Sequence, residues 1–284
     1  MSIRIENLSH RYHPGTPFEK ITLRNITLDI ETGACVGIAG RSGSGKTTLI
    51  QHMNGLLKPA TGKILVDGAD SLAELRRQVG VLFQYPEQQL FGETVFKDIA
   101  FGLSNNGMGC SETELRVREA MTVVGLDEAL LERSPFTLSG GQQRRVAIAG
   151  VLVMRPRILV LDEPAAGLDP QGRSELMAFF GKLRQETGIT LLLASHTLDD
   201  IVRLADRVVI LNQGAVEAEG KTREVIRDTR LLEIAGLTAP PITCFMNRLK
   251  QMLPEIDDCL LTIEEARDEL MRLWNLERRK GGIC

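Results

Sequence analysis

Eight consecutive residues between positions 40 and 47 have the types and spacing of a loop that binds phosphate. They are Gly40, Arg41, Ser42, Gly43, Ser44, Gly45, Lys46 and Thr47, and Thr48 follows them. Glycines let backbone N–H groups converge on phosphate oxygens, a lysine neutralises the β- and γ-phosphates, and a final hydroxyl binds Mg²⁺. An apolar strand at 34–39 and a helix at 47–57 are expected around the loop, so the segment predicts a nucleotide site in which Lys46 and Thr47 take these roles.

Two adjacent acidic residues, Asp162 and Glu163, follow an apolar run at 158–161 that predicts a buried strand. This position places both carboxylates at the C-terminal edge of a parallel sheet, beside the phosphate loop. There Asp162 can hold Mg²⁺ through water, and Glu163 has the chemistry of a general base that directs the attacking water. Acidic pairs are common at strand ends, so this prediction depends on the pair's place after the phosphate loop and the glycine-rich segment at 138–142.

The segment Leu138 to Gln142 resembles the signature sequence of ATP-binding cassette (ABC) proteins. A Ser-Gly-Gly turn would also fit, but a helix is expected directly after the glycines, where backbone donors and the positive helix end suit an anion. The resemblance implies that these residues reach the γ-phosphate of ATP bound to a second chain, so that function needs a dimer. The residues so assigned are Ser139, Gly140, Gly141 and Gln142.

Four further residues match motifs of ABC proteins: His196, Gln84, Asp169 and Tyr12. The resemblance implies that His196 contacts the γ-phosphate and that Gln84 contacts Mg²⁺ and the attacking water. It also implies that Asp169 communicates across the dimer and that Tyr12 stacks on adenine, although an aromatic residue near an N-terminal strand is by itself more often part of a core. The remaining histidines are expected on the surface: His10, His13 and His52.

Strand-like runs alternate with helical stretches, which predicts an α/β fold with a mainly parallel sheet. The resemblance implies a P-loop NTPase ABC cassette with a RecA-like core, an N-terminal antiparallel β subdomain and a helical subdomain inserted at about 94–154. The nucleotide-binding domain is predicted at 1–229 and a helical appendage at 230–284. Two strands at 207–211 and 215–219 predict a hairpin.

The appendage is expected to form two amphipathic helices, the first entered at Pro240 and the two separated by Pro254. Thr262 and Glu265 predict a capping box at the start of the second helix. Five apolar residues then share one face: Ile263, Ala266, Leu270, Leu273 and Trp274. An apolar face usually means burial, so packing onto the core is expected, with a subunit interface as the alternative.

The composition is that of a globular chain of 284 residues, with 43% hydrophobic residues and a net charge of -3. This charge gives no reason to expect nucleic acid as a partner. The short basic pair Arg144 and Arg145 is expected on a solvated face or at a helix C-terminus. The longest apolar stretch, at 146–154, is far below the roughly 20 residues of a membrane span. The start of the sequence lacks a signal-peptide pattern, which predicts a cytoplasmic location. Five scattered cysteines indicate neither a zinc site nor a disulfide framework.

Three peripheral segments resemble the ATPases of energy-coupling factor (ECF) transporters, and most closely the second of that family's two A-type paralogues. They lie at 12–19, 83–91 and 133–136, while Gln88 and Gln143 depart from the residues frequent in that family. The resemblance implies a motor on the cytoplasmic face of the cell membrane that takes up vitamins or transition-metal ions. Its partners would be a second A-type ATPase, a transmembrane T subunit that contacts residues 85–91, and membrane-embedded S components that bind the cargo. The second ATPase could be another copy of this chain, but a paralogue is predicted.

Three alternatives bear on this interpretation. A conventional ABC importer with its own permease would use the same catalytic residues. An ABC ATPase of DNA repair or translation is disfavoured by the lack of a coiled-coil insertion, a cysteine cluster, a second cassette and a basic stripe. A purely regulatory cassette is disfavoured because Glu163 and His196 are both present.

Overall fold

The computed structural model describes residues 3–67, 71–257 and 260–280, which form two sheets and a set of surrounding helices. The larger sheet has the order β5-β6-β7-β3-β8-β9 and is parallel except for β9. Its strands are β3 (Cys35–Ala39), β5 (Val79–Leu82), β6 (Ile158–Asp162), β7 (Thr190–Ser195), β8 (Arg207–Asn212) and β9 (Ala215–Lys221). The smaller sheet is antiparallel, in the order β2-β1-β4. Its strands are β1 (Ile3–Tyr12), β2 (Lys20–Ile30) and β4 (Thr61–Val66). The predicted α/β class, with a mainly parallel sheet and an N-terminal antiparallel one, is confirmed.

The central strands of the larger sheet position the residues predicted to bind and hydrolyse the nucleotide. Strands β3, β6 and β7 are buried along their whole length, as expected for parallel strands covered on both faces. Because they are parallel, their C-terminal ends lie at one edge of the sheet, in the order β6, β7, β3. The phosphate loop follows β3, Glu163 follows β6 and His196 follows β7, which brings the three segments together.

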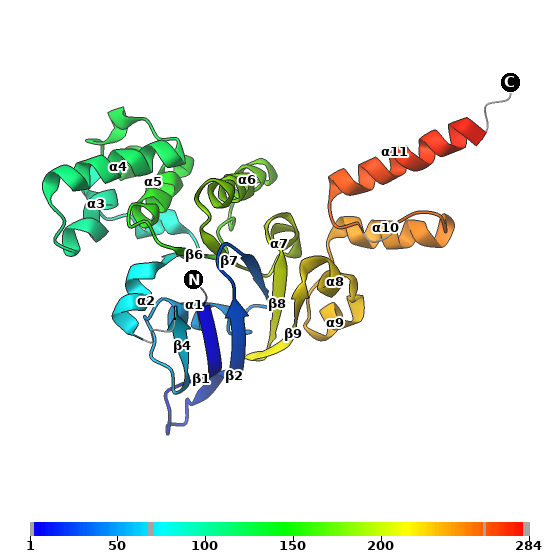
Figure 1. Ribbon diagram of the computed structural model, residues 1–284, viewed down its shortest axis with the longest axis horizontal. Coiled ribbons are helices and arrows are strands. Elements are labelled where there is room, and N and C mark those ends of the chain that lie inside the picture. The colour runs from blue at the N-terminus through cyan, green and yellow to red at the C-terminus, as the bar shows by residue number, and fades with distance from the viewer. Residues whose placement is uncertain (1–2, 68–70, 258–259, 281–284) are drawn as a thin grey trace.

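The helices before α10 fall into two groups (Figure 1). Those that follow the sheet strands are α1 (Lys46–Met53), α2 (Leu72–Gln78), α6 (Pro170–Thr187), α7 (Leu198–Leu204), α8 (Thr222–Arg227) and α9 (Thr229–Ile234). A second group lies apart from the small sheet and comprises α3 (Val95–Asn105), α4 (Cys110–Val124) and α5 (Gly140–Leu152) with three short 3₁₀ turns, η1 (Pro86–Gln89), η2 (Glu128–Leu130) and η3 (Pro135–Thr137). One hydrophobic cluster runs from this group into the large sheet, so the helical region is packed onto the core.

One expectation about the first group of helices was wrong, and one helix was not predicted. Helix α1 ends at Met53 instead of residue 57, because Gly55 adopts a left-handed conformation with φ 72°. Helix α2 was not expected, since it is mostly polar and Leu75 is its one buried side chain. A hydrophobic period cannot reveal a helix that buries so little.

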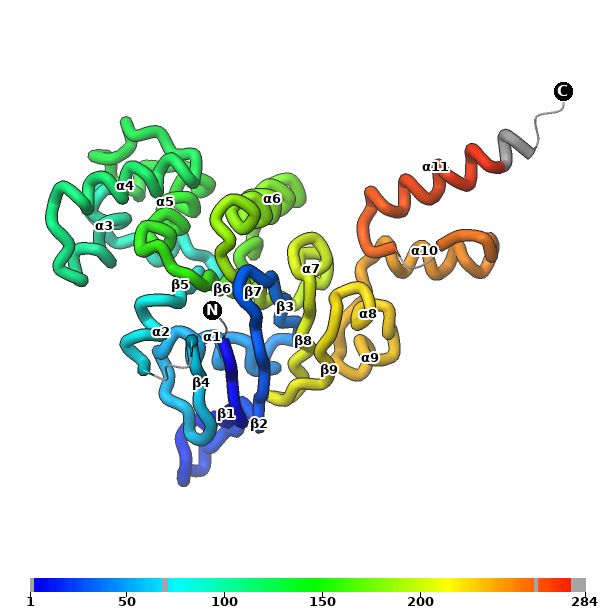
Figure 2. The backbone as a smooth tube through the Cα atoms, viewed as in Figure 1, coloured from blue at the N-terminus to red at the C-terminus, as the bar shows by residue number. Residues whose placement is uncertain are grey.

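The last two helices, α10 (Pro241–Met252) and α11 (Ile263–Lys280), form a small core of their own. That core contains Met246, Ile256, Leu260 and Ala266, with Ile242, Leu249 and Leu273 against it. Helix α11 projects from the body of the molecule (Figures 1 and 2). Ile263 and Trp274 on its apolar face are therefore 64% and 58% exposed, and the prediction that this face packs onto the main core was wrong. The predicted cap is present in part: Thr262 Oγ1 accepts from Glu265 N at 3.2 Å, but the Glu265 carboxylate accepts from Leu261 N.

Within the described ranges, the search for a helix both long and apolar enough to cross a bilayer finds none.

Candidate active site

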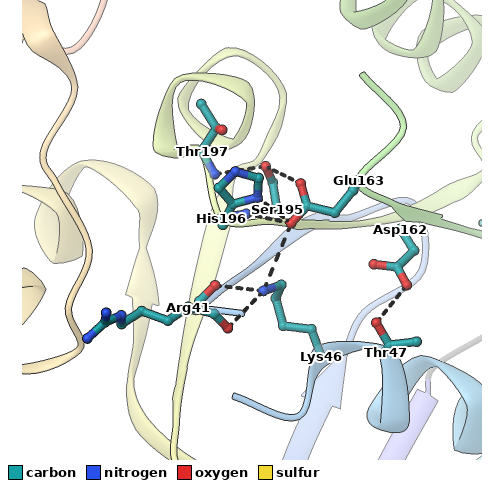
Figure 3. Close-up of polar contacts among 9 residues, drawn as sticks. Arg41, Lys46, Thr47, Asp162, Glu163, Ser195, His196 and Thr197 are labelled. Carbon is teal, nitrogen blue, oxygen red and sulfur yellow. Dashed lines mark hydrogen bonds and ion pairs between the residues drawn. The ribbon is translucent and has the colours of Figure 1, made fainter. Parts of the chain in front are cut away.

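The phosphate loop joins β3 to α1 and lies against β2. Gly45 has φ 110°, and a Cβ atom there would meet the Leu23 side chain at 2.8 Å, so only glycine fits. The Lys46 ammonium donates to the backbone oxygens of Gly40 and Arg41 at 2.6 and 3.2 Å (Figure 3). Burial lowers the pKa of Lys46, although the nearby Glu163 carboxylate acts in the opposite direction. The loop thus holds a nearly buried cation where phosphate oxygens would converge.

Thr47 and Asp162 form an oxygen-rich pair at the edge of the sheet. The Thr47 hydroxyl donates to Asp162 Oδ2 at 3.0 Å, and Gln84 lines the same cleft. Burial raises the pKa of Asp162, while the hydrogen bond from Thr47 opposes that rise. A hydroxyl, a carboxylate and an amide oxygen are the hard ligands that Mg²⁺ prefers, so the chemistry of this donor set fits the ion.

Glu163 is held in a strained position by its neighbours. Its backbone has φ 50°, which is uncommon for a residue other than glycine. Its Oε1 accepts from the backbone N of His196 at 2.9 Å and lies 2.7 Å from His196 Nδ1, while Oε2 accepts from Ser195 Oγ at 3.4 Å. Oε1 also lies 3.9 Å from Lys46 Nζ. The carboxylate therefore stands between the phosphate-loop lysine and the exposed imidazole of His196 (Figure 3).

A cleft of about 810 Å³ collects most of the predicted site residues. Its lining includes Tyr12, Arg41, Ser42, Gly43, Gly45, Lys46, Thr47, Thr48, Gln84, Asp162, Glu163 and His196. Gly40 and Ser44 belong to the same loop but are buried and do not line the cleft. Its size and mixture of backbone donors, charged groups and one aromatic ring suit a nucleotide.

The signature segment does not reach this cleft. Ser139 caps α5, with its Oγ accepting from Gln142 N at 3.3 Å and its own N donating to Gln142 Oε1 at 3.1 Å. A Cβ atom added at Gly140 or Gly141 would meet no other atom of the described chain within 4 Å. Asp169 is also remote from the cleft, and its exposed side chain caps α6 by accepting from Gly172 N at 2.8 Å. The end of α5 thus presents open backbone donors away from the chain's own phosphate loop.

One wall of the cleft was not predicted from the sequence. Residues 236–239, which precede α10, line it together with Lys20 and Thr22 of β2. Gly236 contacts Arg41 so closely that a Cβ atom there would lie 2.3 Å from Arg41 Cδ, and Figure 3 shows the Arg41 side chain pointing away from Lys46. No local signal in the chain indicates this contact, because it joins segments far apart in sequence.

Two of the three histidines expected on the surface are not on it: His52 is buried and His10 is half-buried. His52 is 1% exposed and the ring nitrogens of His10 are buried, whereas His13 is exposed as expected. The rings of His10 and Tyr12 are 4.6 Å apart, and the ring of His52 lies 4.6 Å from that of His10, so the two histidines follow the aromatic residue of the cleft. The prediction for His10 and His52 was wrong because their burial depends on contacts between their rings, and the sequence around each histidine does not indicate those contacts.

Comparison with known proteins decides the family. The model of the ABC transporter family matches residues 23–166. The chain is also 51% identical, over 96% of its length and 98% of the other protein, to the energy-coupling factor transporter ATP-binding protein EcfA2 of Acetivibrio thermocellus. This chain is an ABC transporter ATPase of the energy-coupling factor family. The EcfA2 protein of Caldanaerobacter subterraneus subsp. tengcongensis, 49% identical over 96% of this chain and 97% of its own length, gives the same result.

Solved structures of ABC ATPases agree with this fold. The structure of cbiO1 from Clostridium perfringens, described as part of the ABC transporter complex cbiONQ, has a TM-score of 0.72 and 36% identity. The matched region covers 89% of this chain and 95% of the cbiO1 chain. A dimeric post-hydrolysis structure of the ATP-binding cassette MJ0796, bound to ADP and Pi, has a TM-score of 0.68 and 30% identity over 78% of this chain and 98% of that one.

In this ABC ATPase a buried arginine connects three parts of the site. Arg144, in α5 and 6% exposed, makes two hydrogen bonds of 2.9 Å to the carboxylate of Glu87 in η1. It also donates to the backbone oxygens of Pro164 and Ala166, which follow Glu163, at 3.4 and 3.1 Å. Burial tends to raise the pKa of Glu87, but the hydrogen bonds from Arg144, a backbone hydrogen bond and the positive charge of Arg144 together lower it. The expectation that Arg144 lies on a solvated face or at a helix C-terminus was wrong, because it is buried and near the N-terminal end of α5, whereas Arg145 is exposed.

Replacing Arg144 by methionine is expected to lower the free energy of unfolding by about 3 kcal/mol, because the partly buried Glu87 carboxylate and two carbonyl oxygens lose their donor. The urea midpoint measures the change. Arg145→Met is the matched control, since this neighbouring guanidinium is exposed and donates to the carbonyl oxygens of Val124 and Gly125, with no ion pair to a carboxylate among the described residues. Equal losses in the two variants would show that the buried ion pair has no special role.

Proposed function

We propose that this chain is the ATP-hydrolysing subunit of an energy-coupling factor transporter, in which it powers uptake of vitamins or transition-metal ions. The observation that carries the proposal is the separation, on one chain, of a complete phosphate cleft from an exposed signature helix end. The cleft needs the signature segment of another cassette, and the signature segment needs the cleft of that cassette. ATP would therefore close two cassettes face to face. The names of the EcfA2 relatives and the dimeric cassette structure support this arrangement.

The residues of the cleft divide the chemistry among them. Lys46 and the loop N–H groups bind the β- and γ-phosphates, and Tyr12 stacks on the adenine base. Thr47, Gln84 and Asp162 would hold Mg²⁺, which supplies positive charge to the phosphate oxygens. Glu163 accepts the proton of the attacking water, and His196 orients Glu163 and reaches the γ-phosphate. Ser139, Gly140, Gly141 and Gln142 add donors to the partner's γ-phosphate, and Asp169 lies at the contact between the two cassettes.

The proposed assembly pairs this chain with a paralogous A-type ATPase on the cytoplasmic face of the cell membrane. The segment from Tyr85 to Phe91 would contact the transmembrane T subunit, which couples to S components that bind the cargo. Tyr85 and Phe91 are 38% and 60% exposed, and the Phe91 ring packs edge-on against the exposed Phe101 at 4.7 Å. Within the chain, residues 1–229 would form the nucleotide-binding domain, with its helical subdomain at about 94–154, and residues 230–284 the appendage.

Affinity purification of the tagged chain from its native membranes, followed by mass spectrometry, tests this function. We expect a paralogous cassette, one T-type membrane protein and several small S proteins. Phe91→Asp should lose the T protein and keep the cassette. Val123→Asp, at a position on α4 that is 49% exposed, should lose neither. A dedicated permease pair would instead show a conventional importer, and nucleic-acid proteins without membrane partners would overturn the transport role.

A further inference from the structure

Three aromatic rings form a column that runs from the nucleotide cleft into the protein interior. Tyr12 and His10 are on β1, and His52 is on α1, the helix that follows the phosphate loop. The rings of Tyr12 and His10 are 4.6 Å apart at an interplanar angle of 80°, and those of His10 and His52 are 4.6 Å apart at 69°. Both pairs have the edge-to-face arrangement that aromatic rings prefer. The column therefore connects the cleft ring to the phosphate-loop helix.

The two histidines are packed as rings, with few hydrogen bonds. Among the described residues, neither nitrogen of His10 and not Nε2 of His52 has a hydrogen-bond partner, while His52 Nδ1 lies 3.2 Å from Leu57 O. Burial lowers the pKa of His10, and burial together with the neighbouring His10 lowers the pKa of His52 to about 4. Buried nitrogens without partners cost free energy, so hydrogen bonding does not account for these residues at these positions.

The other contacts of Tyr12 are weak. Its hydroxyl lies 3.4 Å from Thr48 Oγ1 and 3.5 Å from Gln51 Oε1, at the limit of hydrogen bonding. The exposed ring of His13 is 6.5 Å away and tilted. The face-to-edge contact with His10 is the closest ring contact of Tyr12, and His52 supports His10 from behind.

We propose that His10 and His52 are positioning residues that fix the orientation in which the Tyr12 ring stacks on the base of ATP. The inference rests on the proposed role of Tyr12. A ring held in one orientation loses less conformational freedom when it binds a base, so the column raises affinity for the base and leaves the phosphate contacts unchanged. The column also fixes the distance between base and phosphates, because His52 and the phosphate loop are connected through α1.

Equilibrium binding to the full-length chain, with ATP and with inorganic tripolyphosphate in the presence of Mg²⁺, tests the proposal. His10→Leu fills the buried space without an aromatic edge, and His10→Phe restores the ring without its nitrogens. Both remove buried nitrogens that have no partner, so both are expected to fold. Tyr12→Ala measures the whole contribution of the stacked ring, and Leu8→Ala, at a fully buried position of the same strand, measures the effect of loosening β1.

We expect Tyr12→Ala to weaken ATP binding at least tenfold and His10→Leu about fivefold, with tripolyphosphate binding unchanged in both. His10→Phe should stay within about twofold of the parent protein, and Leu8→Ala should leave the ratio of the two affinities unchanged. An unchanged ratio in Tyr12→Ala would refute the base-binding role of Tyr12 itself. A loss of ATP affinity in Tyr12→Ala with a normal ratio in His10→Leu would overturn the positioning role, and so would an equal loss for both ligands in His10→Leu.

Discussion

Replacing Glu163 by glutamine is expected to lower the rate of ATP hydrolysis by a factor of about 100 or more, because a positioned general base contributes about 10²- to 10⁴-fold. The amide has nearly the same shape and can still accept from the His196 backbone N, but it cannot take a proton from water. ATP binding should be retained, since loss of the carboxylate 3.9 Å from Lys46 makes the phosphate loop more positive. Phosphate release and equilibrium ATP binding, measured on the same preparation, separate the two effects.

Asp199→Asn is the matched control for this experiment. Asp199 also lines the cleft, but it has no proposed part in the chemistry, and its variant should keep hydrolysis within about threefold of the parent rate. Undiminished turnover in Glu163→Gln would remove Glu163 from the role of base. A large loss in both variants would instead point to the general negative charge of the cleft.

Replacing Gly141 by aspartate is expected to leave the isolated chain folded and able to bind ATP, yet to lower the ATPase rate of the assembled pair at least about tenfold. A Cβ atom at this position meets no atom of the described chain within 4 Å, and an acidic residue in the first turn suits the dipole of α5. In the proposed pair, however, the carboxylate would face the γ-phosphate bound by the partner, where a donor is worth about 10²- to 10³-fold. Rates of the isolated and the paired chain, measured at saturating ATP, give the comparison.

Gly109→Asp provides a matched control, because Gly109 also has open space around it and stands at the N-terminus of α4 in the same group of helices. This variant should be active in the pair. If Gly141→Asp is also fully active in the pair, the signature segment does not contact a neighbouring nucleotide. If it fails to bind ATP as an isolated chain, the assignment of separate sites on one chain is wrong.

The features predicted well from sequence are those whose information lies in one short segment. The phosphate loop, the strand that ends at Asp162 and the hairpin of β8 and β9 each carry their turn residues and apolar runs in contiguous positions. The parallel order of β6, β7 and β3 then brings Glu163 and His196 together without any further signal.

The features that sequence reasoning missed depend on contacts between distant segments. In the sequence Arg144 belongs to a short basic pair typical of a surface, whereas in the structure it is bound by the Glu87 carboxylate and two carbonyl oxygens. His52 is a polar residue type, and the sequence does not show that its ring packs against His10. The exposed residues on the apolar face of α11 show that an amphipathic pattern does not specify which surface will bury that face. In each case the missing information is the identity of the neighbour, which neither hydrophobic period nor spacing contains.

Residues 236–239 form one wall of the cleft and lead into α10. Nucleotide binding and the stability of the C-terminal segment are therefore thermodynamically linked. A ligand that fills the cleft rests against the phosphate loop and this wall together, so part of its binding energy stabilises the chain that leads into α10. Linkage is reciprocal, and whatever holds α10 and α11 in place changes the affinity of the cleft by the same factor. The C-terminal helices are thereby an input to the energetics of ATP binding, although none of their own residues is part of the catalytic set.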